Sequence, residues 1–136
     1  MPGPKKGYSA GVRQETYASM TKYNARKTIV DGITFDSKLE ADRYIQLKLM
    51  NKAGEITDLQ LQPELQIFQG YVNHYTGEKH KSRFYVGDFK YLDLHTQQWI
   101  IEDTKGMETP EFRLKWEYVQ SEYPEYVFRK ITRDMV

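Results

Sequence analysis

An acid and a lysine two residues apart, Asp103 and Lys105, have types and spacing that could support chemistry. They lie in the segment WIIEDTKG (99–106), whose two isoleucines predict a buried strand. Successive side chains of a strand point to opposite faces, so Asp103 and Lys105 share one face and Glu102 lies on the other. The carboxylate can then hold a metal ion while the lysine ammonium lies beside an attacking water.

Asp88 supplies a second carboxylate, in the segment VGDF (86–89) of the preceding predicted strand. Two carboxylates on adjacent strands can share a hard cation such as Mg²⁺, which keeps several of its waters. Such an ion lowers the pKa of a bound water and stabilises charge on a phosphate, while Lys105 positions the nucleophile or offsets developing charge. The alternative is that these charges only form ion pairs between exposed strands.

Glu40 is the third candidate acid, and two interpretations of it stay open. Ser37 and Glu40 have the S-x-x-E spacing of a capping box, which satisfies backbone donors at a helix start. Glu40 also shares a helix face with Tyr44 and Leu47, which turns it toward the body of the protein. A carboxylate on that side needs a partner, and a metal site would supply one.

Local signals along the chain predict an α/β fold, with a mixed central sheet flanked by helices and the element order α-β-β-β-α-β. Capping and proline signals delimit the helices, and alternating apolar residues indicate the strands. The expected elements are a hairpin over 28–35 turning at Asp31-Gly32, a helix from Ser37 to Gly54, strands within 59–71 interrupted by Pro63, a polar loop over 72–80, paired strands over 83–94 and 98–104, a helix from Thr109-Pro110 to Pro124, and a strand over 126–131.

Four segments in order carry a resemblance to a known family: GITFDSKLEA (32–41), LQPE (61–64), GDF (87–89) and IEDTKG (101–106). Together they resemble the PD-(D/E)xK nuclease superfamily, and more closely a family of small phage and prophage nucleases associated with Holliday-junction resolution. The resemblance covers roughly residues 22–131 and implies a restriction-endonuclease-like core. It also implies roles for four residues: metal coordination by Asp88 and Asp103, catalysis by Lys105, and a supporting or metal-linked role for Glu40.

One residue departs from the superfamily pattern. The commonest acid before x-Lys is glutamate, whereas this chain has Asp103 there and Glu102 beside it. A bulge in the strand could exchange the two, so the strand register decides which of them faces the site.

The charge distribution suggests a polyanionic partner. Residues 1–30 carry six basic residues against one acid, a net charge of +5, whereas residues 31–136 carry 14 basic and 18 acidic residues, a net charge of −4. We expect a flexible basic arm over residues 1–22 and a nuclease domain over 23–136. Lysine and arginine contact DNA phosphates without any motif, although each could equally be a solvated surface charge. The candidates are Lys22, Arg26, Lys27, Arg113 and Lys115.

Several classes of protein find no support. The chain of 136 residues has no cysteine, so disulfides and thiolate metal sites are excluded. It shows neither a Gly-rich phosphate loop nor a G-x-S-x-G motif, so nucleotide hydrolysis and acyl transfer have no basis. No apolar run is long enough for a membrane span, and we expect a cytoplasmic protein, in the bacterial host cell if it is phage-encoded.

The sequence therefore predicts a Mg²⁺- or Mn²⁺-dependent endonuclease that cleaves DNA, with Holliday junctions or other branched DNA of phage or prophage recombination and repair as its substrate. Resolving a four-way junction needs two symmetric nicks, so we expect a homodimer. The alternatives are a nicking or repair nuclease with no junction preference, and a non-catalytic DNA-binding protein on the same fold.

Overall fold

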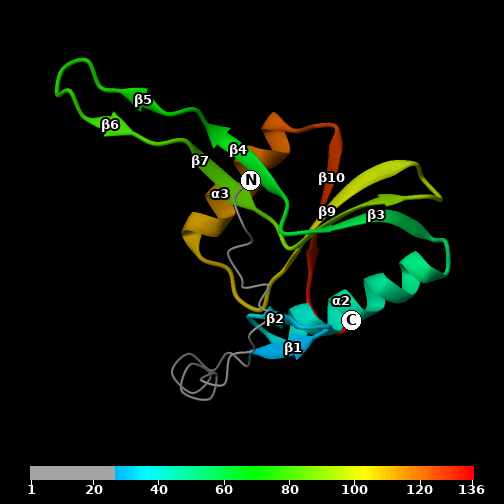
Figure 1. Cartoon of the computed structure of the whole chain (residues 1–136). Coiled ribbons are helices and arrows are strands. Elements are labelled where there is room, and N and C mark those ends of the chain that lie inside the picture. Colours follow the sequence, from blue (N-terminus) through cyan, green and yellow to red (C-terminus); the bar gives the residue numbers. More distant parts are fainter. Residues whose placement is uncertain (1–26) are drawn as a thin grey trace.

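The computed structural model describes residues 27–136 (Figure 1), so the expected arm over residues 1–22, together with Lys22 and Arg26, lies outside the described part. The described chain confirms the α/β class. Its elements are β1 (Thr28–Val30), β2 (Ile33–Phe35), α2 (Lys38–Lys52), β3 (Ile56–Leu61), β4 (Glu64–Phe68), β5 (Tyr71–Val72), β6 (Lys79–His80), β7 (Arg83–Val86), β8 (Phe89–Asp93), β9 (Gln98–Thr104), α3 (Pro110–Glu122), β10 (Tyr126–Ile131) and a short 3₁₀ helix, η1 (Arg133–Met135).

The central sheet has four strands in the order β10-β9-β8-β3, with β10 parallel to β9 and the other neighbours antiparallel. Successive side chains of β9 point to opposite faces of the sheet, so they belong to two different hydrophobic clusters. Ile100 packs with Tyr44 and Leu47 of α2, whereas Ile101 packs with Trp116 and Val119 of α3. The sheet is thus mixed and flanked by helices, as the sequence predicted, and the structure places α2 on one face and α3 on the other.

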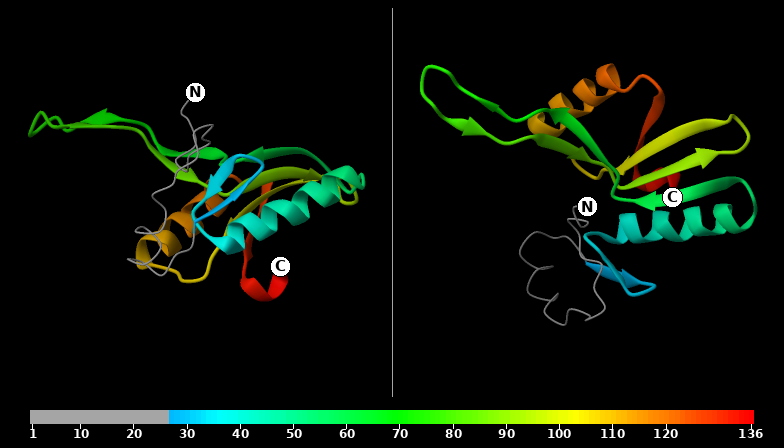
Figure 2. Two further views of the ribbon diagram at one scale, coloured as in Figure 1. Left: turned by 60° about the horizontal axis from the view of Figure 1, so that its bottom comes forward. Right: turned by 45° about the horizontal axis from the view of Figure 1, so that its top comes forward.

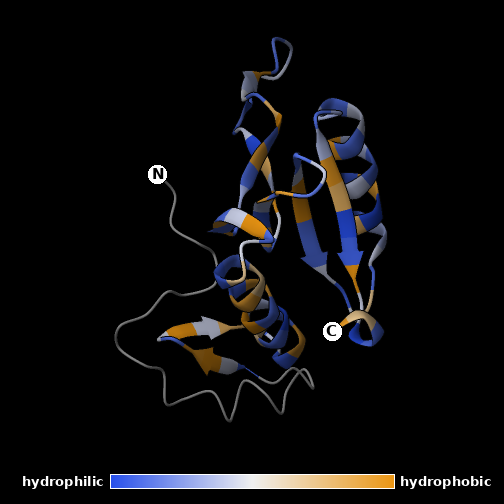
Figure 3. Cartoon of the chain, turned by 90° about the vertical axis from the view of Figure 1, so that its right-hand side faces the viewer, coloured by the Kyte–Doolittle hydropathy of each residue, from blue (hydrophilic) through white to orange (hydrophobic). Residues whose placement is uncertain are grey.

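Both helices begin where local signals placed them. The Ser37 hydroxyl oxygen accepts a hydrogen bond from the Glu40 N–H at 3.1 Å, and α2 ends at Lys52, two residues before Gly54. In the same way the Thr109 hydroxyl accepts from the Phe112 N–H at the start of α3. Hydrophobic and hydrophilic residues alternate along each helix (Figure 3), as expected of helices that pack one side against a sheet.

The predicted first hairpin is also present. β1 and β2 pair in antiparallel fashion, and the two turn residues, Asp31 and Gly32, have φ angles of 54° and 75°. Two consecutive residues with positive φ are typical of the tight turns that match the twist of paired strands. The hairpin packs on α2 through Phe35, whose ring centroid lies 5.1 Å from that of Tyr44.

The expected single strand over residues 83–94 is wrong, because the chain kinks at Gly87-Asp88. Before the kink β7 pairs with β4, and after it β8 pairs with β3 and β9. Gln62-Pro63 makes the matching break between β3 and β4. Hydrogen bonds hold the two kinks together: the Gln62 N–H donates to the Asp88 carbonyl at 2.9 Å, and the Gly87 N–H donates to the Pro63 carbonyl at 3.0 Å.

The polar loop predicted over 72–80 is only partly a loop, because β5 and β6 pair within and beside it. With β4 and β7 they form a long hairpin that leaves the central sheet. Its inner part, β4 and β7, packs against α3, and its outer part, β5 and β6, projects beyond that helix (Figures 1 and 2). The simple α-β-β-β-α-β order is therefore incomplete. We call the outer part of this hairpin, residues 66–84, the β-arm; its base is the cross-strand pair Gln66 and Phe84.

Candidate active site

Asp103 and Lys105 meet at the end of β9, as their spacing predicted. Lys105 follows the last residue of the strand, and its Nζ lies 3.5 Å from Oδ1 of Asp103, a carboxylate only 4% exposed. The Lys105 N–H donates to the Ile131 carbonyl at 2.9 Å, which ties this end of β9 to β10. The Lys105 ammonium also lies over the Phe112 ring of α3, 4.2 Å from its centroid. The ammonium is therefore held between a carboxylate and an aromatic face.

Tyr85 of β7 is a site residue that the sequence analysis missed. Its hydroxyl donates to Oδ2 of Asp103 at 2.6 Å. Burial raises the pKa of Tyr85 far above that of an exposed phenol, and the negative charges of Asp103 and Asp88 raise it further. The hydroxyl therefore keeps its proton and acts as a donor to Asp103. Its only signal in the sequence is its place in the strand leading to Asp88, which does not mark a tyrosine as functional.

Asp88 is brought to the same end of the sheet by the kink after β7. Its carboxylate is 5% exposed, and Oδ2 accepts hydrogen bonds from both the backbone N–H and the hydroxyl of Thr104, each at 2.7 Å. The Asp88 N–H donates to the Glu102 carbonyl at 2.9 Å. Thr104, the residue after Asp103, thus anchors the Asp88 carboxylate. The sequence analysis had left Thr104 without a role.

Gly87, at the kink, lies close to β9. A Cβ there would lie 3.1 Å from Cγ2 of Ile101 and 3.4 Å from the Tyr85 ring. A side chain at this position would require Ile101 to shift by a few tenths of an ångström. Gly87 therefore allows the close approach that delivers Asp88 to the end of β9.

Glu102 lies on the opposite face of β9 from Asp103. It is fully buried and accepts two hydrogen bonds from Arg43 of α2, from Nε at 2.8 Å and from a terminal guanidinium nitrogen at 2.5 Å. The Tyr91 hydroxyl donates to the same carboxylate. The β8–β9 pairing runs without a register shift from Phe89–Glu102 to Asp93–Gln98. Asp103 rather than Glu102 therefore faces Lys105.

Glu40 lies in the first turn of α2 and is buried. This end of α2 lies at the end of the sheet where β9 and β10 finish, since Arg133, just beyond β10, forms an ion pair with Asp42 at 2.9 Å (Figure 1). Glu40 is thus at the same end of the sheet as Asp103. It belongs to α2, however, the helix whose Arg43 binds Glu102 on the opposite face of β9. The Ser37 oxygen caps the Glu40 N–H, so the role of the Glu40 carboxylate stays a prediction.

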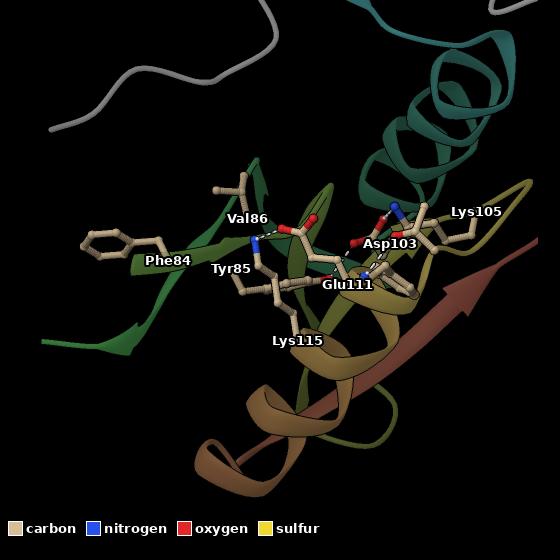
Figure 4. A pocket seen from close by; sticks show the side chains of 9 residues that line it. Phe84, Tyr85, Val86, Asp103, Lys105, Glu111 and Lys115 are labelled. Carbon is tan, nitrogen blue, oxygen red and sulfur yellow. Dashed lines mark hydrogen bonds and ion pairs between the residues drawn. The ribbon is translucent and has the colours of Figure 1, made fainter. Parts of the chain in front are cut away.

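An open pocket surrounds Asp103 and Lys105 (Figure 4). β7 forms one wall and α3 the other, and the lining residues are Phe84, Tyr85, Val86, Asp103, Lys105, Thr109, Glu111, Phe112 and Lys115. Of the predicted DNA contacts, Lys115 lines this pocket and forms an ion pair with Glu111 at 3.2 Å. Arg113 is exposed on α3 and Lys27 is exposed ahead of β1, and neither lines the pocket.

Two carboxylates at this end of the sheet are of the kind that a hard divalent cation binds; Asp103 lines the pocket and Asp88 lies outside its lining. Asp88 and Asp103 offer buried carboxylate oxygens at the ends of neighbouring strands, the ligand type that Mg²⁺ and Mn²⁺ prefer. Residues 27–136 contain no group of three or more histidine, aspartate or glutamate side chains arranged to hold an ion. Magnesium bound through one or two carboxylates and several waters does not need a third side chain.

The sheet with a helix on each face and a charged pocket at the end of β9 defines an α/β domain with a candidate acid–lysine site. The chain belongs to the family described as "Protein of unknown function (DUF1064)", which matches residues 20–135. No curated protein and no solved structure matches it. Within residues 27–136, neither helix has the length and apolar character needed to cross a membrane.

Proposed function

We propose that this protein is a Mg²⁺- or Mn²⁺-dependent endonuclease that hydrolyses phosphodiester bonds of DNA in the pocket between β7 and α3. The observation that carries the proposal is the pairing of the buried Asp103 carboxylate with the Lys105 ammonium at 3.5 Å. The Asp88 carboxylate accepts hydrogen bonds from Thr104, the residue between Asp103 and Lys105. A carboxylate pair with an adjacent ammonium can support metal-assisted phosphodiester hydrolysis, because the carboxylates can hold the metal and the ammonium can offset charge on the phosphate.

In this proposal Asp88 and Asp103 hold the metal ion. The bound metal would lower the pKa of a water and stabilise negative charge on the phosphate. Lys105 is 28% exposed, so its ammonium can meet an entering phosphate and offset the charge that develops during attack. Tyr85 keeps Asp103 oriented through the 2.6 Å hydrogen bond, and Thr104 does the same for Asp88.

The preferred substrate that we propose is branched DNA such as a four-way junction, cleaved by a homodimer. The resemblance to junction-resolving nucleases supports this substrate. Symmetry supports the dimer, because two nicks in strands of like polarity call for two copies of a single site related by a twofold axis. Lys115 at the pocket and the exposed Arg113 and Lys27 are proposed phosphate contacts.

The test is a cleavage assay with Mg²⁺ or Mn²⁺ on linear duplex, nicked, single-stranded and four-way-junction DNA. We expect cleavage of the junction by the wild type, and its loss in Asp88→Asn, Asp103→Asn and Lys105→Ala, with folding and DNA binding retained. Activity at the wild-type level in any of these variants would remove the proposed site. DNA binding by the wild type with no cleavage under any metal would indicate a non-catalytic DNA-binding protein.

A further inference from the structure

The β-arm exposes aromatic and apolar side chains that contribute nothing to either hydrophobic cluster. Tyr75 at the tip is 100% exposed and Tyr71 is 52% exposed, and Phe68, Val72 and Phe84 are exposed as well. β5 and β6 pair only with each other in a separate two-stranded sheet. Exposed aromatic and apolar side chains gathered on one projecting element are typical of a surface that contacts a partner.

Specific contacts give the β-arm a defined shape. The Tyr71 and His80 rings stack at 4.5 Å across β5 and β6, and the Gly70 N–H donates to the Ser82 hydroxyl at 3.0 Å. At the tip the Asn73 side-chain oxygen accepts from the N–H groups of Tyr75 and Thr76, at 2.9 and 3.1 Å. The hairpin therefore presents Tyr75 on an ordered turn, which lowers the entropy cost of binding.

The charge of the β-arm differs in sign from that of the rest of the described chain. Between residues 66 and 84 the charged residues are three basic ones, Lys79, Lys81 and Arg83, and one acid, Glu78, a net charge of +2. The remaining described residues, 27–65 and 85–136, carry 12 basic and 17 acidic residues, a net charge of −5. A polyanion would therefore be attracted to the β-arm and repelled by most of the body.

The β-arm also continues directly into the candidate active site. Phe84, at its base, lines the same pocket as Asp103, and the next residue, Tyr85, donates to that carboxylate. A DNA strand with its phosphate in the pocket would thus have the β-arm as its neighbour on the β7 side (Figures 1 and 4).

We propose that the β-arm is a DNA-binding element that holds the duplex beside the cleaved phosphate and reads the branch point. Lys79, Lys81 and Arg83, which are all exposed and occupy every second position in the second half of the hairpin, contact the phosphates. Tyr75 stacks on a base that is unstacked at the branch point, since an exposed aromatic ring binds a base face regardless of its identity. This inference rests on the proposed DNA substrate and names the surface that recognises it.

The test measures DNA binding by fluorescence anisotropy in EDTA, so that binding is separated from cleavage. The triple variant Lys79→Gln/Lys81→Gln/Arg83→Gln should bind duplex DNA more than about tenfold more weakly. The slope of log affinity against log salt should fall by about 0.9 for each phosphate that the variant no longer neutralises. Lys81→Gln alone should show a smaller change in the same direction, and Lys52→Gln, which removes an exposed charge from the far end of α2, should show none.

Tyr75→Ala should weaken binding to a junction with unpaired bases by about fivefold or more and leave duplex binding unchanged. Tyr118→Ala, which removes an exposed tyrosine from α3, is the matched control. Wild-type affinity and salt slope in the triple variant would overturn the inference, even if the wild-type protein cleaves DNA. Conversely, binding that depends on the β-arm in a protein that never cleaves would leave the inference standing and remove the proposed nuclease activity.

Discussion

Arg43 of α2 donates two hydrogen bonds to the carboxylate of Glu102, a residue 59 positions later in the chain, and both side chains are buried. Because of this pair, the adjacent acids Glu102 and Asp103 have different structural roles. Glu102 joins a helix to the sheet, whereas Asp103 faces the pocket with Lys105. The two acids should therefore respond differently to the same conservative substitution.

Glu102→Gln should destabilise the protein, because it leaves the Arg43 guanidinium buried without a countercharge. Breaking a buried ion pair from one side typically costs about 3–5 kcal/mol. Asp103→Asn should abolish cleavage and change the melting temperature little. Thermal unfolding and cleavage per folded molecule measure the two effects, and Glu55→Gln, at an exposed position, is the control. A stable but inactive Glu102→Gln variant would mean that the assignment of the two acids is reversed.

Glu40 and Ser37 can be separated in the same manner. Ser37→Ala removes the oxygen that caps α2, so the free energy of unfolding should fall by about 1 kcal/mol with turnover retained. For Glu40→Gln we predict the opposite result, a loss of cleavage with little change in melting temperature. An active but destabilised Glu40→Gln variant would show that Glu40 belongs to the cap alone.

Tyr85→Phe should slow cleavage by roughly tenfold to a hundredfold, because Asp103 loses a hydrogen bond to a charged acceptor worth about 1.5–3 kcal/mol. The ring is kept, so its packing against Trp116 should survive. Affinity for uncleaved DNA, measured in EDTA, should be unchanged. Equal losses of affinity and turnover would instead point to a role in holding DNA.

The buried phenol of Tyr91 should make the stability of the protein fall at alkaline pH. Burial raises the pKa of Tyr91, and the Glu102 carboxylate raises it further. The folded state thus keeps a phenol proton that the unfolded state loses above about pH 10. The resulting stabilisation is complete below that pH and declines as the pH rises toward the folded-state pKa. Unfolding in denaturant at several alkaline pH values should show a steeper loss of stability for the wild type than for Tyr91→Phe; parallel curves would contradict this.

The predicted homodimer has consequences for both the mass of the protein in solution and the products of cleavage. Light scattering should give twice the monomer mass of 16.2 kDa. A supercoiled plasmid bearing a cruciform should be converted to linear product without accumulation of nicked circles, since both cuts fall within the lifetime of one complex. A monomer that yields only nicked circles would favour a nicking nuclease without junction preference.

Features determined by the sequence alone depend on groups a few residues apart. The Asp31-Gly32 turn, the Ser37 and Thr109 caps and the shared face of Asp103 and Lys105 follow from backbone geometry and side-chain periodicity, so local pattern was enough to place them. A mixed sheet flanked by helices could also be predicted, because alternating apolar residues indicate the strands and capping signals delimit the helices.

The tertiary structure alone decided which distant groups meet. The kink at Gly87-Asp88 is held by hydrogen bonds to Gln62-Pro63, the break between β3 and β4 some 25 positions earlier. The contacts of Arg43 with Glu102 and of Tyr85 with Asp103 likewise join separate elements. A kink of this kind leaves no periodic signal in the sequence. A tyrosine or arginine in an amphipathic element also gives the same sequence pattern whether its polar group lies in solvent or contacts a buried carboxylate. Only the packing of the two helices against opposite faces of β9 distinguishes those outcomes.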